Sequence, residues 1–325
     1  MTGLLPLDWA ILTVSLFNTI LLLWLGLTVL LTAERRSLGV WILCAGLLLG
    51  AGFFISHTAI LGGGLTLFSS SLNFWWRLGW LPVITVPLAW YGMILWFVGY
   101  WSPAAGVLRH RHRMWLGFLS VFMVVLLIVL YMGHGLPTFL DIAQLNLSGV
   151  LTLGGLPMLL VLYPVYMVAC IGLAVAALRH PAQSERFMGD IARRRTYPWL
   201  LAASLMLLAV SLLVGWFMLW TVGRTRAPGY DGPSSTLIAS AAWFDMGIQI
   251  LVALAVIFIG QAIVSYEIFT GKSLPRREFF RHWRDALFLT GGLRDRGWRQ
   301  PHVQSKSHLQ STPHHVLDGC LLRVV

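Results

Sequence analysis

Residues 237–269, LIASAAWFDMGIQILVALAVIFIGQAIVSYEIF, carry the strongest structural signal in the chain. About 30 helical residues at 1.5 Å each exceed the ~30 Å apolar core of a bilayer, which predicts a membrane-spanning helix that tilts or continues beyond the membrane. Six further apolar runs precede it: Leu7–Thr32, Leu38–Leu61, Trp80–Trp101, Met114–Gly133, Leu156–Leu178 and Tyr197–Val222. The sequence therefore predicts an all-α membrane protein, a bundle of seven transmembrane helices.

The composition agrees with this fold class. Of the 325 residues, 58% are hydrophobic and only 11% are charged, and the mean hydropathy is +0.77. These values exclude an ordinary soluble domain and predict a multi-pass protein of the plasma membrane. Cys44 and Cys170 lie inside apolar runs, so we interpret them as small packing residues rather than as a disulfide or a metal site.

The basic residues gather in alternate loops. Of the 23 Lys and Arg residues, twenty lie in the first, third and fifth loops or after Thr270. The other three, Arg77, Arg224 and Arg226, lie in the second and sixth loops. Because basic loops remain on the cytoplasmic side of a membrane, the pattern predicts an N-terminus outside and a C-terminus in the cytoplasm.

The charge pattern also divides the chain into three parts: the membrane bundle over 1–269, a juxtamembrane connector over 270–290 and a tail over 291–325. In the connector, Phe279, Trp283 and Leu287 repeat every four residues with arginines toward the other face, which predicts a basic amphipathic helix on the membrane surface. The tail is polar and aperiodic, and this composition is typical of disorder. We expect the net charge of +11 to meet the anionic lipid headgroups of the bilayer and not nucleic acid.

Polar residues mark one face of the seventh run. At 100° per residue, Asp245, Gln249 and Glu267 fall on one side of the predicted helix, which should face the bundle interior because a carboxylate in lipid costs about 3 kcal/mol. His57 and His134 lie at similar depth on other runs.

We therefore hypothesise an outward-opening pocket around His57, His134, Asp245 and Gln249. It would bind a metal, a proton or a small cationic or polar ligand, because imidazoles and carboxylates suit both metal binding and pH sensing. The alternative is a set of unrelated interfacial residues bonded to water or backbone. The spacing carries no metal signature, so no metal or cofactor is assigned.

Several absences argue against an enzyme. The seven runs contain no lysine for a retinal Schiff base, and the chain has neither a His-Glu-x-x-His zinc motif nor a Gly-x-Ser-x-Gly elbow. Gly271-Lys272-Ser273 has the end of a phosphate-binding loop without the glycine that should stand five residues earlier. No catalytic residues are predicted.

The end of the seventh run resembles a known family. Gly260-Gln261-Ala262-Ile263-Val264-Ser265-Tyr266-Glu267-Ile268-Phe269-Thr270-Gly271-Lys272, followed by Leu274-Pro275-Arg276-Arg277, is similar to the end of the seven-helix N-terminal region of certain bacterial membrane histidine kinases. The resemblance implies an input module that precedes cytoplasmic sensor and transmitter domains. It also implies that Glu267, Lys272, Arg276 and Arg277 belong to a signal connector, although Glu267 also suits a salt bridge to a cytoplasmic arginine.

This chain departs from the family because it contains no transmitter, no ATP-binding domain and no phosphoacceptor box. A truncated or frameshifted gene would account for both that departure and the compositional break near Gly291. We expect a membrane signal-input module that forms a homodimer. It would pass its signal through the seventh helix to a cytoplasmic signalling domain or kinase. The alternatives are a small multi-pass transporter or channel and, next, a membrane haem or metal protein.

Overall fold

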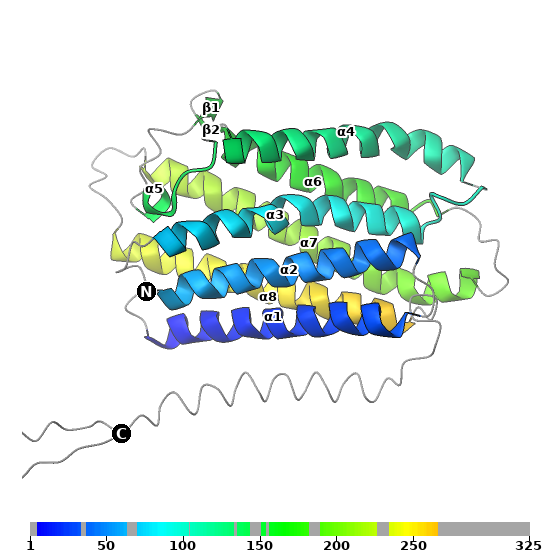
Figure 1. Cartoon of the computed structure of the whole chain (residues 1–325), viewed down its shortest axis with the longest axis horizontal. Helices are drawn as coiled ribbons and strands as arrows, with labels where there is room; N and C mark the ends of the chain where they lie inside the picture. Colours follow the sequence, from blue (N-terminus) through cyan, green and yellow to red (C-terminus); the bar gives the residue numbers. More distant parts are fainter. Residues whose placement is uncertain are drawn as a thin grey trace, which may run out of the picture.

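Seven long helices make up most of the described part of the chain. The computed structural model describes residues 5–33, 37–63, 70–103, 105–132, 135–143, 151–153, 156–181, 189–225 and 234–265. The long helices are α1 (Leu5–Thr32), α2 (Leu38–Gly63), α3 (Ser70–Phe97), α4 (Gly106–Met132), α6 (Met158–Leu178), α7 (Gly189–Thr225) and α8 (Ser235–Ser265) (Figure 1). All seven are long and apolar enough to cross a membrane, which confirms the predicted helical class and the number of spans.

Small elements lie between α4 and α6. A single turn of helix, α5 (Phe139–Ala143), is followed by two short antiparallel strands, β1 (Thr152–Leu153) and β2 (Leu156–Pro157). Because the seven helices alternate in direction, these elements lie at the end of the bundle where α1 begins (Figure 1). We call this end the N-terminal end and the other the opposite end.

The predicted third span was misplaced at both ends. It was expected over Trp80–Trp101, but α3 begins ten residues earlier, at Ser70, and ends at Phe97. Gly99, with φ of 87°, ends the helix: its N–H donates to the Trp96 carbonyl, and the Tyr100 N–H donates to the Leu95 carbonyl. This pair of bonds is a Schellman motif, which depends on a glycine that can adopt a left-handed conformation.

The fourth span was also placed too late. It was expected from Met114, but α4 begins at Gly106 and includes the basic stretch Arg109–Arg113. The hydropathy of that stretch is low, so a search for apolar runs assigns it to a loop. It is helical because Leu108 and His112 continue the buried face that Leu119, Leu126 and Leu130 follow further along the helix.

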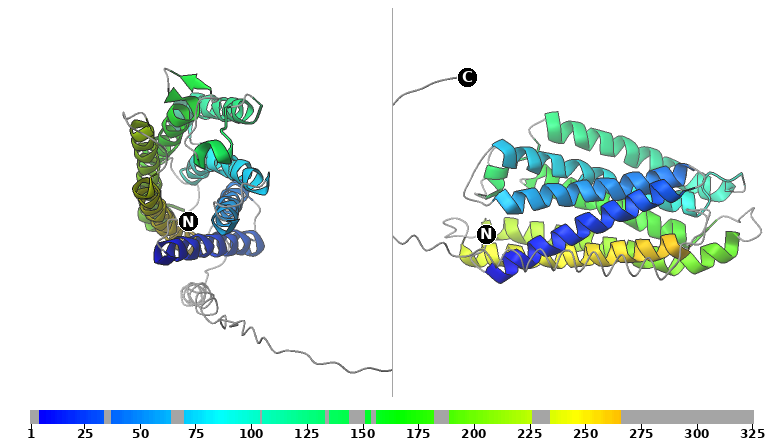
Figure 2. Two further views of the ribbon diagram at one scale, coloured as in Figure 1. Left: turned by 90° about the vertical axis from the view of Figure 1, so that its left-hand side faces the viewer. Right: turned by 60° about the horizontal axis from the view of Figure 1, so that its bottom comes forward.

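Six of the helices form a closed ring. Each contacts its neighbours in the order α1, α2, α3, α6, α7, α8 and back to α1, and α4 packs outside the ring against α3 and α6. Figure 2 shows this arrangement end-on, with α4 at the periphery. The outer face of α4 is accordingly exposed and apolar, with Phe118 at 59% and Val121 at 64% exposure, which suits contact with lipid.

Close packing fixes the contact between α2 and α3. The Trp96 ring lies directly over Gly39, where a Cβ atom would meet the ring at 2.0 Å. Further along, a Cβ atom on Gly79 would lie 2.5 Å from Ser56 Oγ. Only glycine permits these two approaches, and close approach of small residues is a usual source of stability between membrane helices.

Candidate functional site

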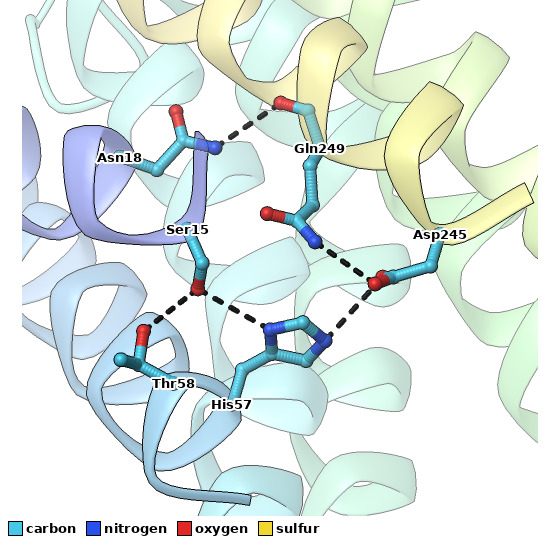
Figure 3. A network of polar contacts seen from close by, with 6 residues as sticks. All are labelled: Ser15, Asn18, His57, Thr58, Asp245 and Gln249. Carbon is cyan, nitrogen blue, oxygen red and sulfur yellow. Dashed lines mark hydrogen bonds and ion pairs between the residues drawn. The ribbon is translucent and has the colours of Figure 1, made fainter. Parts of the chain in front are cut away.

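A histidine and a carboxylate meet between α2 and α8. His57 Nε2 lies 3.3 Å from Asp245 Oδ1, and the two side chains are 20% and 30% exposed (Figure 3). They are 188 residues apart in sequence and meet because α2 and α8 both pack against α1, on either side of it in the ring. The contact is a hydrogen bond when the imidazole is neutral and an ion pair when it is protonated.

The other nitrogen of His57 contacts α1. Ser15 Oγ lies 3.3 Å from His57 Nδ1 and 2.8 Å from Thr58 Oγ1. When His57 donates from Nε2 to Asp245, Nδ1 is an acceptor, so the single Ser15 hydrogen points to His57 and Thr58 donates to Ser15. Protonation of His57 reverses the donor on this side, because Nδ1 then donates to Ser15.

Two amides extend the network toward the middle of the membrane. Gln249 Nε2 donates to Asp245 Oδ2 at 2.9 Å. Asn18 Nδ2 donates to the backbone carbonyl oxygen of Gln249 at 3.1 Å. Both amide side chains are buried. Their side-chain oxygens, Asn18 Oδ1 and Gln249 Oε1, have no donor partner within the described residues. The network therefore retains two buried acceptors.

The network lies inside the apolar span. Asp245 is ten residues from the start of α8 and Ser15 ten from the start of α1, which places both about 15 Å from the N-terminal end at 1.5 Å per residue. A carboxylate at such depth is stable when it faces the bundle interior and is paired. Asp245 meets both conditions through His57 and Gln249.

A cavity of about 370 Å³ lies beside the network, inside the ring. All six ring helices contribute to its wall, and the part of α4 that the structure describes does not. His57 lines the cavity, whereas Asp245 and Gln249 do not. We call this space the central cavity.

The structure brings together three of the four predicted ligand-binding residues: His57, Asp245 and Gln249. His134 lies outside the described residues, as do all the connector residues: Glu267, Lys272, Arg276 and Arg277. The connector 270–290 and the tail 291–325 lie outside them as well. Within the described ranges, no group of three or more His, Cys, Asp or Glu side chains could hold a metal ion. The ligand-binding role of the three residues stays a prediction.

Sequence reasoning left Ser15 and Asn18 of α1 out of the predicted site. Ser15, Asn18 and Leu22 follow the i, i+3, i+7 spacing of one helix face, and all three are buried. Two polar residues on a buried face indicate an interhelical partner, and this signal was present in the sequence. The partner itself depends on which helix lies beside α1.

A buried histidine was also missed. His112 on α4 is 1% exposed, and its Nδ1 lies 2.7 Å from the Tyr91 hydroxyl on α3. The fourth apolar run was expected only from Met114, which left Arg109–Arg113 in a loop, so His112 was not among the candidate site residues. The position of His112 four residues after Leu108, on the buried face of α4, is the signal that would have found it.

Comparisons with known proteins identified no relative. No family model, no curated protein and no solved structure matches the chain. The resemblance to the input region of bacterial histidine kinases stays a prediction. A function can be argued only from the geometry of the site and from the charge of the two ends of the bundle.

Proposed function

We propose that the protein is a signal-input module of the bacterial plasma membrane, with its N-terminus outside and its C-terminus in the cytoplasm. The observation that carries the proposal is the polar network that connects α8 with α1 and α2. A change of protonation or of ligand at this network acts directly on α8. That helix is the last one described, and the chain continues from it into the basic connector 270–290.

The arginines of the described residues support this orientation. Because the helices alternate in direction, the basic residues that begin α4, end α6 and begin α7 share the opposite end of the bundle: Arg109, Arg111, Arg113, Arg179, Arg193, Arg194 and Arg195. The N-terminal end has Arg77 and Arg224. A cytoplasmic location of the arginine-rich end follows from the positive-inside rule.

The connector completes the proposed pathway. Glu267, Lys272, Arg276 and Arg277 follow α8, and their basic members suit the anionic headgroups of the inner leaflet. The output is a cytoplasmic signalling domain or kinase, on which a homodimer of the module acts. The resemblance to histidine kinase input regions supports this output.

A distance measurement tests whether the network moves α8. In a chain with Cys44, Cys170 and Cys320 replaced by Ala, Leu38→Cys and Ser265→Cys place spin labels on α2 and α8 at the opposite end of the bundle. The pH is lowered from about 8 to about 5, across the range in which imidazoles ordinarily gain a proton. We expect the distance distribution between the labels to change in lipid nanodiscs.

Two variants control this experiment. Asp245→Asn removes the carboxylate and should abolish the change. Asp141→Asn removes a carboxylate of α5 that bonds to Thr138 and not to the network, so it should leave the change intact. An identical distribution at both pH values in the parent chain would contradict the proposal.

The central cavity favours a second candidate, a small transporter or channel. Substrate sites of transporters lie between helices near the middle of the membrane, where this cavity lies. Vesicle flux assays with protons, metal cations and small organic cations separate the two functions, because a transporter moves its ligand and an input module does not. Flux that Asp245→Asn abolishes would favour transport.

A further inference from the structure

The central cavity is long and narrow. Its wall follows α2 from Ile42 to Ile60, eighteen residues that rise about 27 Å in a helix, and α3 from Trp76 to Met93. A volume of about 370 Å³ spread over that length describes a thin channel parallel to the helices. All six helices of the ring, which Figure 2 shows end-on, contribute to this wall. Such a shape suits one extended chain and not a compact polar ligand.

The wall of the central cavity is apolar along most of its length. Leu, Ile, Val, Met, Phe and Pro side chains supply the greater part, for example Leu22, Val210, Val252 and Ile259. Gly46 adds width, because a Cβ atom there would come no closer than 3.8 Å to its nearest neighbour, Ala89 Cβ. Cavities with apolar walls bind apolar molecules in preference to water. In a bilayer, alkyl chains are the abundant apolar species.

Polar atoms on the wall gather toward the N-terminal end. His57 lies six residues before the end of α2 and Tyr163 five residues after the start of α6, so both lie in the half of the bundle nearer that end. Trp80 packs edge-on against Tyr163, with the ring centroids 5.6 Å apart. Neither the Trp80 indole N–H nor the Tyr163 hydroxyl makes a hydrogen bond within the part of the chain that the structure describes. The other two tryptophans of the wall do: Trp76 donates to the Pro137 carbonyl and Trp90 to Ser204.

From the length, the apolar wall and the polar end, we propose that the central cavity binds a single-chain amphiphile with a long alkyl chain and a head group that accepts hydrogen bonds. The chain lies along α2 and α3, and a carbonyl or carboxylate head lies at the end where His57, Trp80 and Tyr163 line the wall. A head group there sits against the imidazole whose other contacts are Asp245 and Ser15. The role of this ligand as the stimulus rests on the proposed function, whereas the binding site does not.

Photolabelling of the full-length chain tests the site. The protein in detergent micelles is irradiated with a palmitic acid analogue that carries a diazirine in mid-chain, and the labelled peptides are identified by mass spectrometry. Gly46→Leu fills the cavity, and Gly52→Leu is its matched control on the same helix, because Gly52 lies off the wall and a Cβ atom there meets nothing within 4 Å. Val252→Phe, from α8, blocks the cavity independently of α2.

We expect labels on wall residues of α2, α3 and α8 in the parent chain. Labelling should fall at least about fivefold in Gly46→Leu and Val252→Phe and change by less than about twofold in Gly52→Leu. All variants should elute from a size-exclusion column as a single folded species. Equal labelling in all four proteins, with the adducts on the exposed face of α4, would overturn the proposal. That pattern is expected of lipid that merely surrounds the bundle.

Competition identifies the head group. Excess palmitate or methyl palmitate should displace the probe. Stronger displacement by palmitate would indicate a carboxylate head group, and stronger displacement by methyl palmitate a neutral carbonyl head group. Equal displacement by hexadecane, which has no head group, would show that the polar end plays no part and would overturn that half of the proposal. Labelling inside the cavity without any effect of palmitate on the spin-label distances would leave the binding site standing and remove its role as a stimulus.

Discussion

At the level of single residues, Asp245 is the least expected side chain in α8. It is stable there because Gln249, one turn further along the same helix, donates to one carboxylate oxygen and His57 contacts the other. The pairing with Gln249 follows from the i, i+4 spacing and was visible in the sequence. The pairing with His57 was not, because it depends on the relative height of α2 and α8.

The contact between His57 and Asp245 should have a measurable energy. In a double-mutant cycle with His57→Ala and Asp245→Ala, we expect a coupling of about 1 kcal/mol, the upper part of the range for polar contacts between membrane helices. The free energy of unfolding in mixed micelles of mild detergent and SDS gives the coupling. His57→Ala combined with Asp141→Ala serves as a control and should be additive. A coupling of zero for the first pair would show that the side chains meet without stabilising the fold.

The buried pair of Tyr91 and His112 should behave differently from an exposed one. Tyr91→Phe leaves His112 Nδ1 without its partner in a fully buried place, and we expect the free energy of unfolding to fall by about 1–3 kcal/mol. His112→Phe added to Tyr91→Phe should recover part of the loss, since two apolar rings leave no unpaired polar atom. An unfolding titration of the three variants decides this, and an additive loss would contradict it.

At the level of helices, the boundaries of α3 and α4 show where hydropathy fails. Both helices include polar sequence in their first turns, Ser70 to Asn73 in α3 and Arg109 to Arg113 in α4, and extend beyond the apolar run. The polar ends are helical because single residues in them pack or bond to neighbouring elements, as His112 does with Tyr91 and as Asn73 does with the Phe139 N–H. A window average cannot detect contacts of single residues.

The approach of α2 to α3 predicts opposite effects for two glycines of one helix. Gly39→Ala places a methyl group against the Trp96 ring and should lower the melting temperature in detergent, with a cost of about 1–3 kcal/mol for overpacking. Gly52→Ala meets no atom and should leave stability unchanged or raise it by up to about 1 kcal/mol, because alanine favours the helix. Equal melting temperatures for the two variants would refute the close packing of Trp96 on Gly39.

At the level of the whole molecule, a ring of six helices with a seventh outside has two consequences. It creates the central cavity, and it leaves α4 with an exposed apolar face that only lipid or another membrane protein can cover. The alternation of helix direction also gives the two ends of the bundle different charge, because seven of the nine described arginines lie together at the opposite end.

The proposed orientation predicts which end a membrane-impermeant maleimide reaches in intact cells. In a chain with Cys44, Cys170 and Cys320 replaced by Ala, Gly62→Cys at the N-terminal end should be labelled from outside. His180→Cys at the opposite end should be labelled only after the membrane is made permeable, and both positions are exposed. Labelling of His180→Cys alone in intact cells would reverse the orientation.

Hydropathy and local spacing were sufficient to predict the helical class, the number of spans and the inward position of Gln249 and its neighbour Asp245, because burial in a membrane acts on each helix separately. The ring order, the position of α4 outside it, the contact of Ser15 and His57 with Asp245, and the central cavity depend on the tertiary structure. They result from packing between helices, where single close contacts such as Trp96 on Gly39 set the depth at which two helices face each other. Hydropathy carries no information about that depth.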